Sequence, residues 1–263
     1  MKEFNYKKKF GQNFLKDDRI VNKIVSETKI PSNTLVVEVG PGKGILTREL
    51  SKVAKNVICY EIDEELEGYL IELQSKLGNV KVIFSDFLTR DISTDLNDYT
   101  YDNLYFVSNV PYYITTSILM KIMSSENKFD KITMMIQKEV GERFSAKPCT
   151  KAYSSITVFL NYYYDIKKLF NVSRNEFVPV PNVDSVVISL ISKNDRLSLK
   201  NEKHFFELVR ESFKFKRKTI RNNLKKYDLD TIESVLLLNG FSLSSRAEEL
   251  PLEVFVEISN ALN

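Results

Sequence analysis

The chain has 263 residues, 43% of them hydrophobic and 28% charged, which is typical of a folded globular protein. Its apolar runs are too short for a membrane span and its lysine-rich N-terminus differs from a secretory signal, so we expect a cytoplasmic protein without membrane contact. The sequence holds two cysteines, without CxxC spacing, and one histidine. Metal sites and catalysis by Ser-His-Asp or Cys-His groups therefore lack their usual residues, and we expect no metal.

Positive charge is concentrated in two segments of the chain. Residues 1–16 carry a net charge of +4 and residues 210–226 carry +7, so with +3 overall the remainder is near −8. Two basic segments on an acidic body are typical of a protein that binds a polyanion. Either segment alone is equally well explained as a solvated helix face.

From about residue 20 to residue 140 the hydrophobic pattern alternates between helix-like and strand-like segments. Strands are predicted at the short apolar runs 35–39, 57–60, 80–84, 104–108 and 132–136. Helices are predicted at 20–28, at 45–55 and at the leucine-spaced run 66–77, which ends at Gly78. Strands separated by helices indicate βαβ units, and therefore a parallel sheet with helices on both faces.

After residue 150 the pattern changes. Two β-branched and aromatic runs, Ser155–Tyr164 and Ser185–Ile191, predict an antiparallel strand pair that completes the sheet, with a stiff extended loop at 177–181 between them. From about residue 195 onward every segment is helix-like. We therefore predict an α/β, Rossmann-like domain over residues 1–193, including the basic N-terminal arm, and a small all-α domain over residues 194–263.

A glycine-rich loop follows the first predicted strand. Gly40, Gly42 and Gly44 are three of the eight glycines in the chain, and they let the backbone turn sharply and approach a ligand closely. Their GxGxG spacing departs from the dinucleotide fingerprint, which disfavours an NAD-dependent oxidoreductase. Glu38, directly before the loop, would repel a pyrophosphate but favour a ligand with ammonium and sulfonium groups.

Acidic residues end the next two predicted strands. Glu61 lies 21 residues after Gly40, a separation at which a carboxylate accepts hydrogen bonds from ribose hydroxyls. Asp86 is placed to receive the exocyclic amine of an adenine ring. Because ligands of open α/β sheets bind beyond the carboxyl ends of the strands, we predict that these residues meet in one nucleoside-binding crevice. Each carboxylate alone is also explained as a helix cap.

The motif Asn109-Val110-Pro111-Tyr112 follows the fourth predicted strand. The Asn109 oxygen and the main-chain carbonyl of Val110 or Pro111 would accept hydrogen bonds from the exocyclic amine of a flipped-out base. The nitrogen of that exocyclic amine would become more pyramidal, and its attack on a methyl donor would then depend mainly on positioning. Tyr112 would stack on the base, with Phe177 as the second wall, although either ring could instead be an ordinary core aromatic.

The chain resembles the KsgA/RsmA family of rRNA adenine N6,N6-dimethyltransferases, which are class I S-adenosylmethionine-dependent methyltransferases. The segments that carry the resemblance, in order, are 10–15, 38–44 with Glu61 and Asp86, 109–116, 137–143, 177–185, 216–218 with 222–224, and 246–250. The resemblance implies that Asn13 and Leu15 help to close over S-adenosylmethionine. It also implies that its site is lined by Gly40, Glu61, Asp86 and Asn109.

The implied substrate is the 3′-terminal hairpin loop of small-subunit (16S) rRNA, in which two adjacent adenosines are dimethylated in a step linked to ribosome assembly. We expect a monomer that acts on this RNA or on a pre-assembled small subunit.

The basic segments would contact the phosphates of this RNA. If residues 214–221 form a helix, one basic face of it would consist of Lys214, Arg217, Lys218 and Arg221. The predicted contacts in the N-terminal arm are Lys7, Lys8 and Lys9.

Four positions depart from the family pattern. Cys149 and Ser154 stand where glycine is common, and Tyr113 and Ser117 replace an asparagine and a proline.

Two alternatives remain open: an Erm-type enzyme that methylates large-subunit rRNA and confers macrolide resistance, or a non-catalytic RNA- or DNA-binding factor on the same scaffold. Segments 177–185 and 246–250 favour the small-subunit enzyme, and the intact motif at Asn109 argues against lost catalysis.

Overall fold

The computed structural model describes residues 14–263, which form two compact units. The first contains the described residues to Gly141 together with Lys167–Ser192, and the second contains Glu142–Ile166 together with Lys193–Asn263. The sequence assigned residues 142–166 to the first domain, whereas in the structure they group with the C-terminal helices. The reason is aromatic packing, because Phe159 and Tyr162 contact the ring of Phe205 at centroid distances of 6.4 and 5.3 Å.

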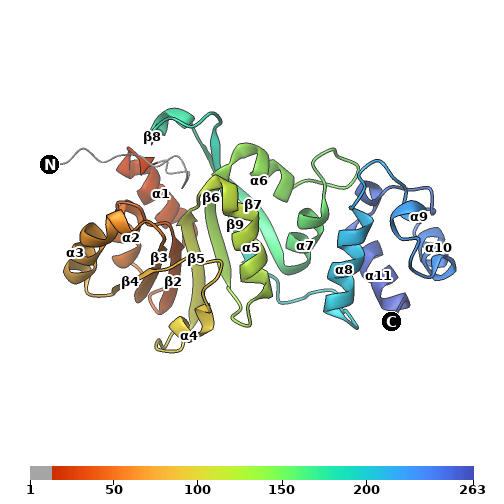
Figure 1. Cartoon of the computed structure of the whole chain (residues 1–263), viewed down its shortest axis with the longest axis horizontal. Coiled ribbons are helices and arrows are strands. Elements are labelled where there is room, and N and C mark those ends of the chain that lie inside the picture. Colours follow the sequence, from red (N-terminus) through yellow and green to blue (C-terminus); the bar gives the residue numbers. More distant parts are fainter. Residues whose placement is uncertain (1–13) are drawn as a thin grey trace. The chain divides into compact units, whose positions relative to one another are not determined.

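A seven-stranded sheet with the order β4-β3-β2-β5-β6-β9-β7 forms the core of the first unit (Figure 1). Its strands are β2 (Thr34–Val39), β3 (Asn56–Glu61), β4 (Val80–Phe84), β5 (Asn103–Asn109), β6 (Lys131–Gln137), β7 (Tyr164–Val172) and β9 (Ser185–Ser192). Neighbouring strands from β4 to β6 are parallel, and β9 runs antiparallel to β6. A separate antiparallel pair joins β1 (Phe14–Leu15) to β8 (Phe177–Val178). The predicted α/β class with a mainly parallel sheet is confirmed.

Helices cover both faces of this sheet. They are α1 (Asp18–Thr28), α2 (Ile45–Ser51), α3 (Glu67–Leu77), α4 (Ile92–Leu96), α5 (Thr115–Ser124) and α6 (Lys138–Phe144). One face packs on α1, α2 and α3, which contribute Ile24, Leu50 and Leu70 to the buried core. On the other face Phe106 and Phe129 meet edge to face at 6.3 Å. Burial on both faces explains why the parallel strands read as continuous apolar runs in the sequence.

The strand predicted at Ser155–Tyr164 is wrong. The segment forms helix α7 (Ser155–Tyr163), and strand β7 begins only at Tyr164. Ser154 begins the helix in an extended conformation, and its N–H donates to Thr157 Oγ1 at 3.2 Å. Six of the nine helical residues are buried, so the apolar, β-branched composition reflects burial on most sides rather than a strand.

The C-terminal part of the second unit is helical, as predicted for residues 194–263. After α7 it contains α8 (Glu202–Ser212), α9 (Ile220–Asn223), α10 (Leu229–Leu238) and α11 (Leu252–Ala261). Cys149 adopts a left-handed conformation with φ of 65°, and its N–H donates to the Glu248 carbonyl at 2.8 Å. This conformation explains why glycine is common at the position, since only glycine adopts it without steric cost. Within residues 14–263, no helix has the length and apolarity needed to span a bilayer.

Candidate active site

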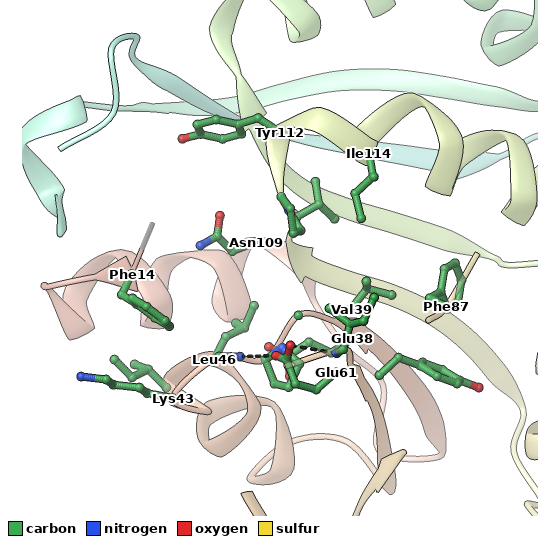
Figure 2. A pocket seen from close by; sticks show the side chains of 18 of the residues that line it. Phe14, Glu38, Val39, Lys43, Leu46, Glu61, Phe87, Asn109, Tyr112 and Ile114 are labelled. Carbon is green, nitrogen blue, oxygen red and sulfur yellow. Dashed lines mark hydrogen bonds between the residues drawn. The ribbon is translucent and has the colours of Figure 1, made fainter. Parts of the chain in front are cut away.

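A pocket lies at the carboxyl ends of β2, β3, β4 and β5 (Figure 2). The predicted site residues that line it are Leu15, Gly40, Glu61, Asp86, Asn109, Val110, Pro111 and Tyr112. They come together because parallel strands end at the same edge of a sheet. Sequence reasoning had assigned no role to Phe14, Ile62 or Tyr113, which also line the pocket. Phe14 lies in segment 10–15 of the resemblance and Tyr113 is one of the four departures from the family pattern, but neither signal indicates a role in the pocket.

The glycine loop lies close to Pro111 on one side and to the Phe14 ring on the other. Gly40 and Gly42 have left-handed backbones, with φ of 70° and 57°. A Cβ atom on Gly40 would contact Pro111 at 3.6 Å, and one on Gly42 would lie only 2.6 Å from the Phe14 ring. Glycine at these positions therefore allows the turn and leaves room for the neighbouring ring.

Glu38 is buried beneath this loop, with 2% of its surface exposed. Its Oε2 accepts hydrogen bonds from Thr47 Oγ1 at 2.7 Å and from Cys59 Sγ at 3.5 Å. Burial raises the pKa of Glu38 to about 7, against an ordinary value of 4.5, and the hydrogen bond from Thr47 only partly opposes this. Glu38 is therefore an acid that changes charge near neutral pH. Nothing in the sequence pattern had marked Thr47 or Cys59 as its partners.

Replacing Glu38 with glutamine is expected to flatten the pH dependence of stability. Between pH 4.5 and 7 the unfolded chain loses this proton while the folded chain keeps it, so rising pH favours unfolding. The stabilisation is complete below pH 4.5 and is lost as pH rises through 7, a loss of about 3 kcal/mol. Urea denaturation of wild type and Glu38→Gln at pH 5, 6, 7 and 8 measures the difference.

The exposed Glu27 on α1 offers a matched control for this change. Glu27→Gln should leave the slope of unfolding free energy against pH as in wild type. If Glu38→Gln also leaves it unchanged, burial of the Glu38 carboxyl does not raise its pKa in solution.

Glu61 joins the end of β3 to the glycine loop. Its Oε1 accepts from the N–H groups of Ile62 and Asp63, each at 2.9 Å, and its Oε2 accepts from Gly42 N–H at 3.3 Å. Burial raises the pKa of this carboxyl, against the lowering effect of these three hydrogen bonds. Because Oε2 makes only one long bond, it retains acceptor capacity toward a ligand.

The motif that follows β5 lies at the same pocket. In the view of Figure 2 the Asn109 amide lies between the rings of Phe14 and Tyr112. The Tyr112 hydroxyl pairs with Ser185 Oγ at 2.7 Å, which ties the ring to the start of β9. Burial raises the pKa of the Tyr112 hydroxyl, so it stays neutral at physiological pH. Ser185 falls in a segment that the resemblance singled out, but its contact with Tyr112 was not foreseen.

Phe177 is not on the pocket wall. Its side chain is fully buried, and it pairs with Leu15 across the β1–β8 ladder. Its ring belongs to the same buried cluster as Val21 and Val172. The stacking role of Phe177 stays a prediction, and it requires the β1–β8 pair to open so that one face of the ring becomes accessible.

The four basic residues predicted to share one helix face are exposed, but they do not lie on one helix. Lys214, Arg217 and Lys218 lie in the turn between α8 and α9, and Arg221 lies in α9. The turn is closed by Asn223, whose Nδ2 donates to the Ser212 carbonyl at 2.7 Å and to the Phe215 carbonyl at 3.3 Å. The predicted residues that lie outside the described part of the chain are Lys7, Lys8, Lys9 and Asn13.

Comparison with known proteins identifies the family. Ribosomal RNA small subunit methyltransferase A of Bacillus cereus (strain B4264) is 40% identical over 268 residues, which cover 98% of this chain and 92% of that protein. The protein of the same name from Bacillus anthracis (strain CDC 684 / NRRL 3495) is 39% identical with the same coverage.

Two solved structures share the fold. A dimethyladenosine transferase from Plasmodium falciparum has a TM-score of 0.76 and 27% identity, covering 93% of this chain and 95% of that one. The 23S rRNA methyltransferase ErmE has a TM-score of 0.73 and 27% identity, covering 95% and 99%. The sequence profile described as "Ribosomal RNA adenine dimethylase" matches residues 3–263, so this chain belongs to the family of ribosomal RNA adenine dimethylases.

Proposed function

We propose that this protein uses S-adenosylmethionine to dimethylate the exocyclic N6 of two adjacent adenosines in small-subunit rRNA. The observation that carries the proposal is the convergence of Asn109 and Tyr112 with Glu61 and Asp86 on one pocket. An amine-binding motif then adjoins a nucleoside-binding site. Identity of 40% to Ribosomal RNA small subunit methyltransferase A, over 98% of this chain, supports the choice of substrate.

The charges of the pocket fit this cofactor. Of the described charged residues that line it, Glu38, Glu61 and Asp86 are acidic and Lys43 is basic. These acidic side chains disfavour a phosphate-bearing cofactor, and as hydrogen-bond acceptors Glu61 and Asp86 suit ribose hydroxyls and an adenine amine. S-adenosylmethionine would supply an activated methyl group on a sulfonium.

Each of these residues has a distinct proposed role. Glu61 accepts hydrogen bonds from the ribose hydroxyls, and Asp86 accepts one from the exocyclic amine of the cofactor. Gly40 lets the backbone approach the cofactor closely. Leu15, with Asn13 from the part of the chain that is not described, covers the cofactor.

Asn109 acts on the substrate amine. An adenine N6 is a poor nucleophile because its lone pair is delocalised into the ring. The Asn109 side-chain oxygen and the main-chain carbonyl of Val110 or Pro111 accept from its N–H groups and hold the lone pair toward the methyl group. Positioning of this kind supplies most of the barrier reduction for such a transfer, and no strong general base is required before attack.

Tyr112 holds the flipped adenine by stacking. A base–aromatic stack contributes about 1–3 kcal/mol, which offsets much of the few kcal/mol needed to unstack the base. Because Ser185 fixes the Tyr112 hydroxyl, the ring is held in place before RNA binds. A stack grips the base without demanding one methylation state, so a monomethylated adenosine can re-enter for the second transfer.

The RNA-binding surface is assigned to the exposed basic residues, and the protein is proposed to act as a monomer on rRNA or on a pre-assembled small subunit. Residues proposed to contact phosphates are Lys214, Arg217, Lys218 and Arg221, together with Lys7, Lys8 and Lys9. Their contribution would be strongly salt-dependent and largely independent of sequence.

Methyl transfer to separated ribosomal subunits tests the proposed function. Undermethylated small and large subunits are incubated with labelled S-adenosylmethionine, and the product nucleosides are identified. Dimethyladenosine on the small subunit alone is expected. Label on the large subunit would instead favour an Erm-type enzyme, for which the structural similarity to ErmE provides the specific support. Absence of label on both, with a folded protein, would favour a non-catalytic binder.

A further inference from the structure

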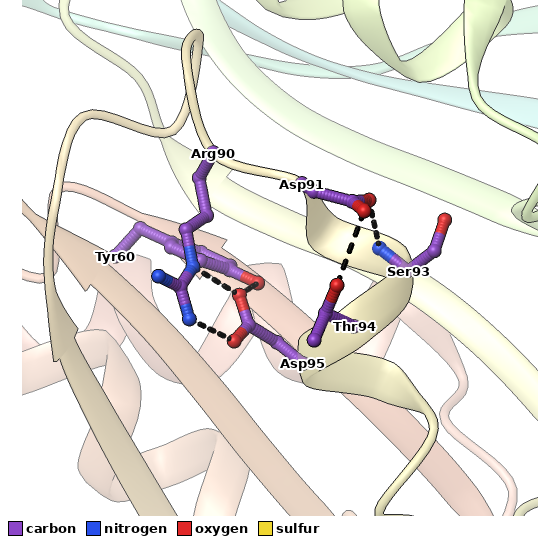
Figure 3. Close-up of polar contacts among 6 residues, drawn as sticks. All are labelled: Tyr60, Arg90, Asp91, Ser93, Thr94 and Asp95. Carbon is purple, nitrogen blue, oxygen red and sulfur yellow. Dashed lines mark hydrogen bonds and ion pairs between the residues drawn. The ribbon is translucent and has the colours of Figure 1, made fainter.

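The turn that carries Asp86 is attached to the rest of the first unit by a polar network (Figure 3). Within the turn, Leu88 N–H donates to Asp86 Oδ1 at 2.9 Å, and the N–H groups of Thr89 and Arg90 donate to the Asp86 carbonyl at 3.1 Å. One carboxylate oxygen is thus fixed to the turn itself. The direction of the other therefore depends on how the turn is held against the sheet.

Arg90 fixes the turn to Asp95, which lies on α4. Its Nε donates to Asp95 Oδ2 at 2.9 Å and its Nη2 donates to Asp95 Oδ1 at 2.6 Å, a side-on bidentate pairing that fixes the orientation of both planar groups. The Asp95 side chain is only 8% exposed, and its hydrogen bond with Arg90 lowers its pKa, so it is ionised at neutral pH. Helix α4 is itself capped by Asp91, which accepts from Ser93 N–H and Thr94 Oγ1, each at 3.1 Å.

Tyr60 connects the same carboxylate to β3. Its hydroxyl donates to Asp95 Oδ2 at 3.0 Å, and its ring meets the Phe87 ring edge to face at 5.2 Å. Tyr60 directly precedes Glu61, and Phe87 directly follows Asp86. Asp95 therefore accepts three hydrogen bonds at the point where the strand that carries Glu61 meets the turn that carries Asp86.

We propose that Asp95 is a positioning residue for recognition of the adenine ring of the cofactor. It is not among the residues that line the pocket, and it acts by fixing the Asp86 carboxylate in the direction of the exocyclic amine. The inference rests on the role proposed above for Asp86. Lys121 Nζ also donates to the Leu88 carbonyl at 3.1 Å, so removal of the Asp95 charge weakens the attachment of the turn without releasing it.

The test is the affinity of Asp95→Asn for two ligands, measured by isothermal titration calorimetry. S-adenosylhomocysteine carries the exocyclic amine, and S-inosylhomocysteine carries a keto oxygen in its place. We expect Asp95→Asn to bind the first roughly 10-fold more weakly and the second with an affinity within about 2-fold of wild type. The double variant Asp86→Asn with Asp95→Asn is expected to bind S-adenosylhomocysteine almost as well as Asp86→Asn alone, because both changes remove the same interaction.

Two further variants keep the result interpretable. Asp98→Asn makes the same change at an exposed position nearby and should match wild type with both ligands. Tyr60→Phe removes one hydroxyl and keeps the packing with Phe87, so it tests the network if Asp95→Asn does not fold. It should give the same dependence on the exocyclic amine at smaller amplitude.

Equal weakening of both ligands by Asp95→Asn would overturn the inference, because the residue would then support the fold in general. Unchanged affinity for both would overturn it as well. If Asp86→Asn weakens binding of S-adenosylhomocysteine and S-inosylhomocysteine equally, or of neither, Asp86 does not recognise the exocyclic amine and the inference about Asp95 is wrong. Binding of S-adenosylhomocysteine to the wild type would still support the proposed function. Only failure of the wild type to bind S-adenosylhomocysteine would contradict the cofactor itself.

Discussion

Asn109→Ala is expected to lower kcat for methyl transfer to small-subunit rRNA by roughly 10²–10³-fold, the loss typical when one preorganised polar contact to a reacting group is removed. The Asn109 oxygen is the side-chain acceptor proposed for the substrate amine, and alanine cannot replace it. Single-turnover methylation with labelled S-adenosylmethionine measures the chemical step, and binding of S-adenosylhomocysteine should change by less than about 10-fold.

Asn103 offers a matched control because it lies at the opposite end of the same strand, β5. Asn103→Ala should retain the single-turnover rate of wild type. If Asn109→Ala keeps more than about a tenth of the wild-type rate, main-chain carbonyls alone orient the amine. If both variants lose activity in parallel with melting temperature, the loss reflects the stability of β5 and not a contact with substrate.

The part of the fold that the sequence predicts is the part set by local pattern. Strands β2 to β6 are apolar runs between helix-like segments, and Gly40 and Gly42 have left-handed backbones that mark the turn after β2. Since parallel strands end at one edge, placing Glu61, Asp86 and Asn109 at strand ends was enough to predict that they share a pocket.

What the sequence could not predict depends on contacts between distant residues. Helix α7 is buried on most sides, which removes the amphipathic periodicity by which helices are recognised. Phe177 is buried because β8 pairs with β1 from the start of the described chain, a pairing with no local signal. The link from Asp95 to Tyr60 joins two elements 35 residues apart in the sequence. The predicted basic helix fails for a related reason, since Asn223 closes a turn there.

Glu61→Gln is expected to weaken binding of S-adenosylhomocysteine by roughly 100-fold, which corresponds to loss of about 3 kcal/mol from charged hydrogen bonds to the ribose. Glutamine preserves the shape of the side chain, and its oxygen can still accept from the N–H groups of Ile62 and Asp63, as Glu61 Oε1 does at 2.9 Å. Its amide nitrogen, however, cannot accept from Gly42 N–H or from a ribose hydroxyl. Isothermal titration calorimetry with the folded variant measures the affinity.

Glu64 provides the control, because it is exposed and lies in the turn just after Glu61. Glu64→Gln should bind with wild-type affinity. A cofactor analogue that lacks the ribose 2′-hydroxyl identifies the interaction. Wild type should bind this analogue more weakly than S-adenosylhomocysteine, whereas Glu61→Gln should bind the two ligands with similar affinity. If the variant and wild type lose the same factor when the 2′-hydroxyl is removed, and again for an analogue that lacks the 3′-hydroxyl, Glu61 does not contact the ribose hydroxyls. Its buried carboxylate would then serve only to join β3 to the glycine loop through Gly42.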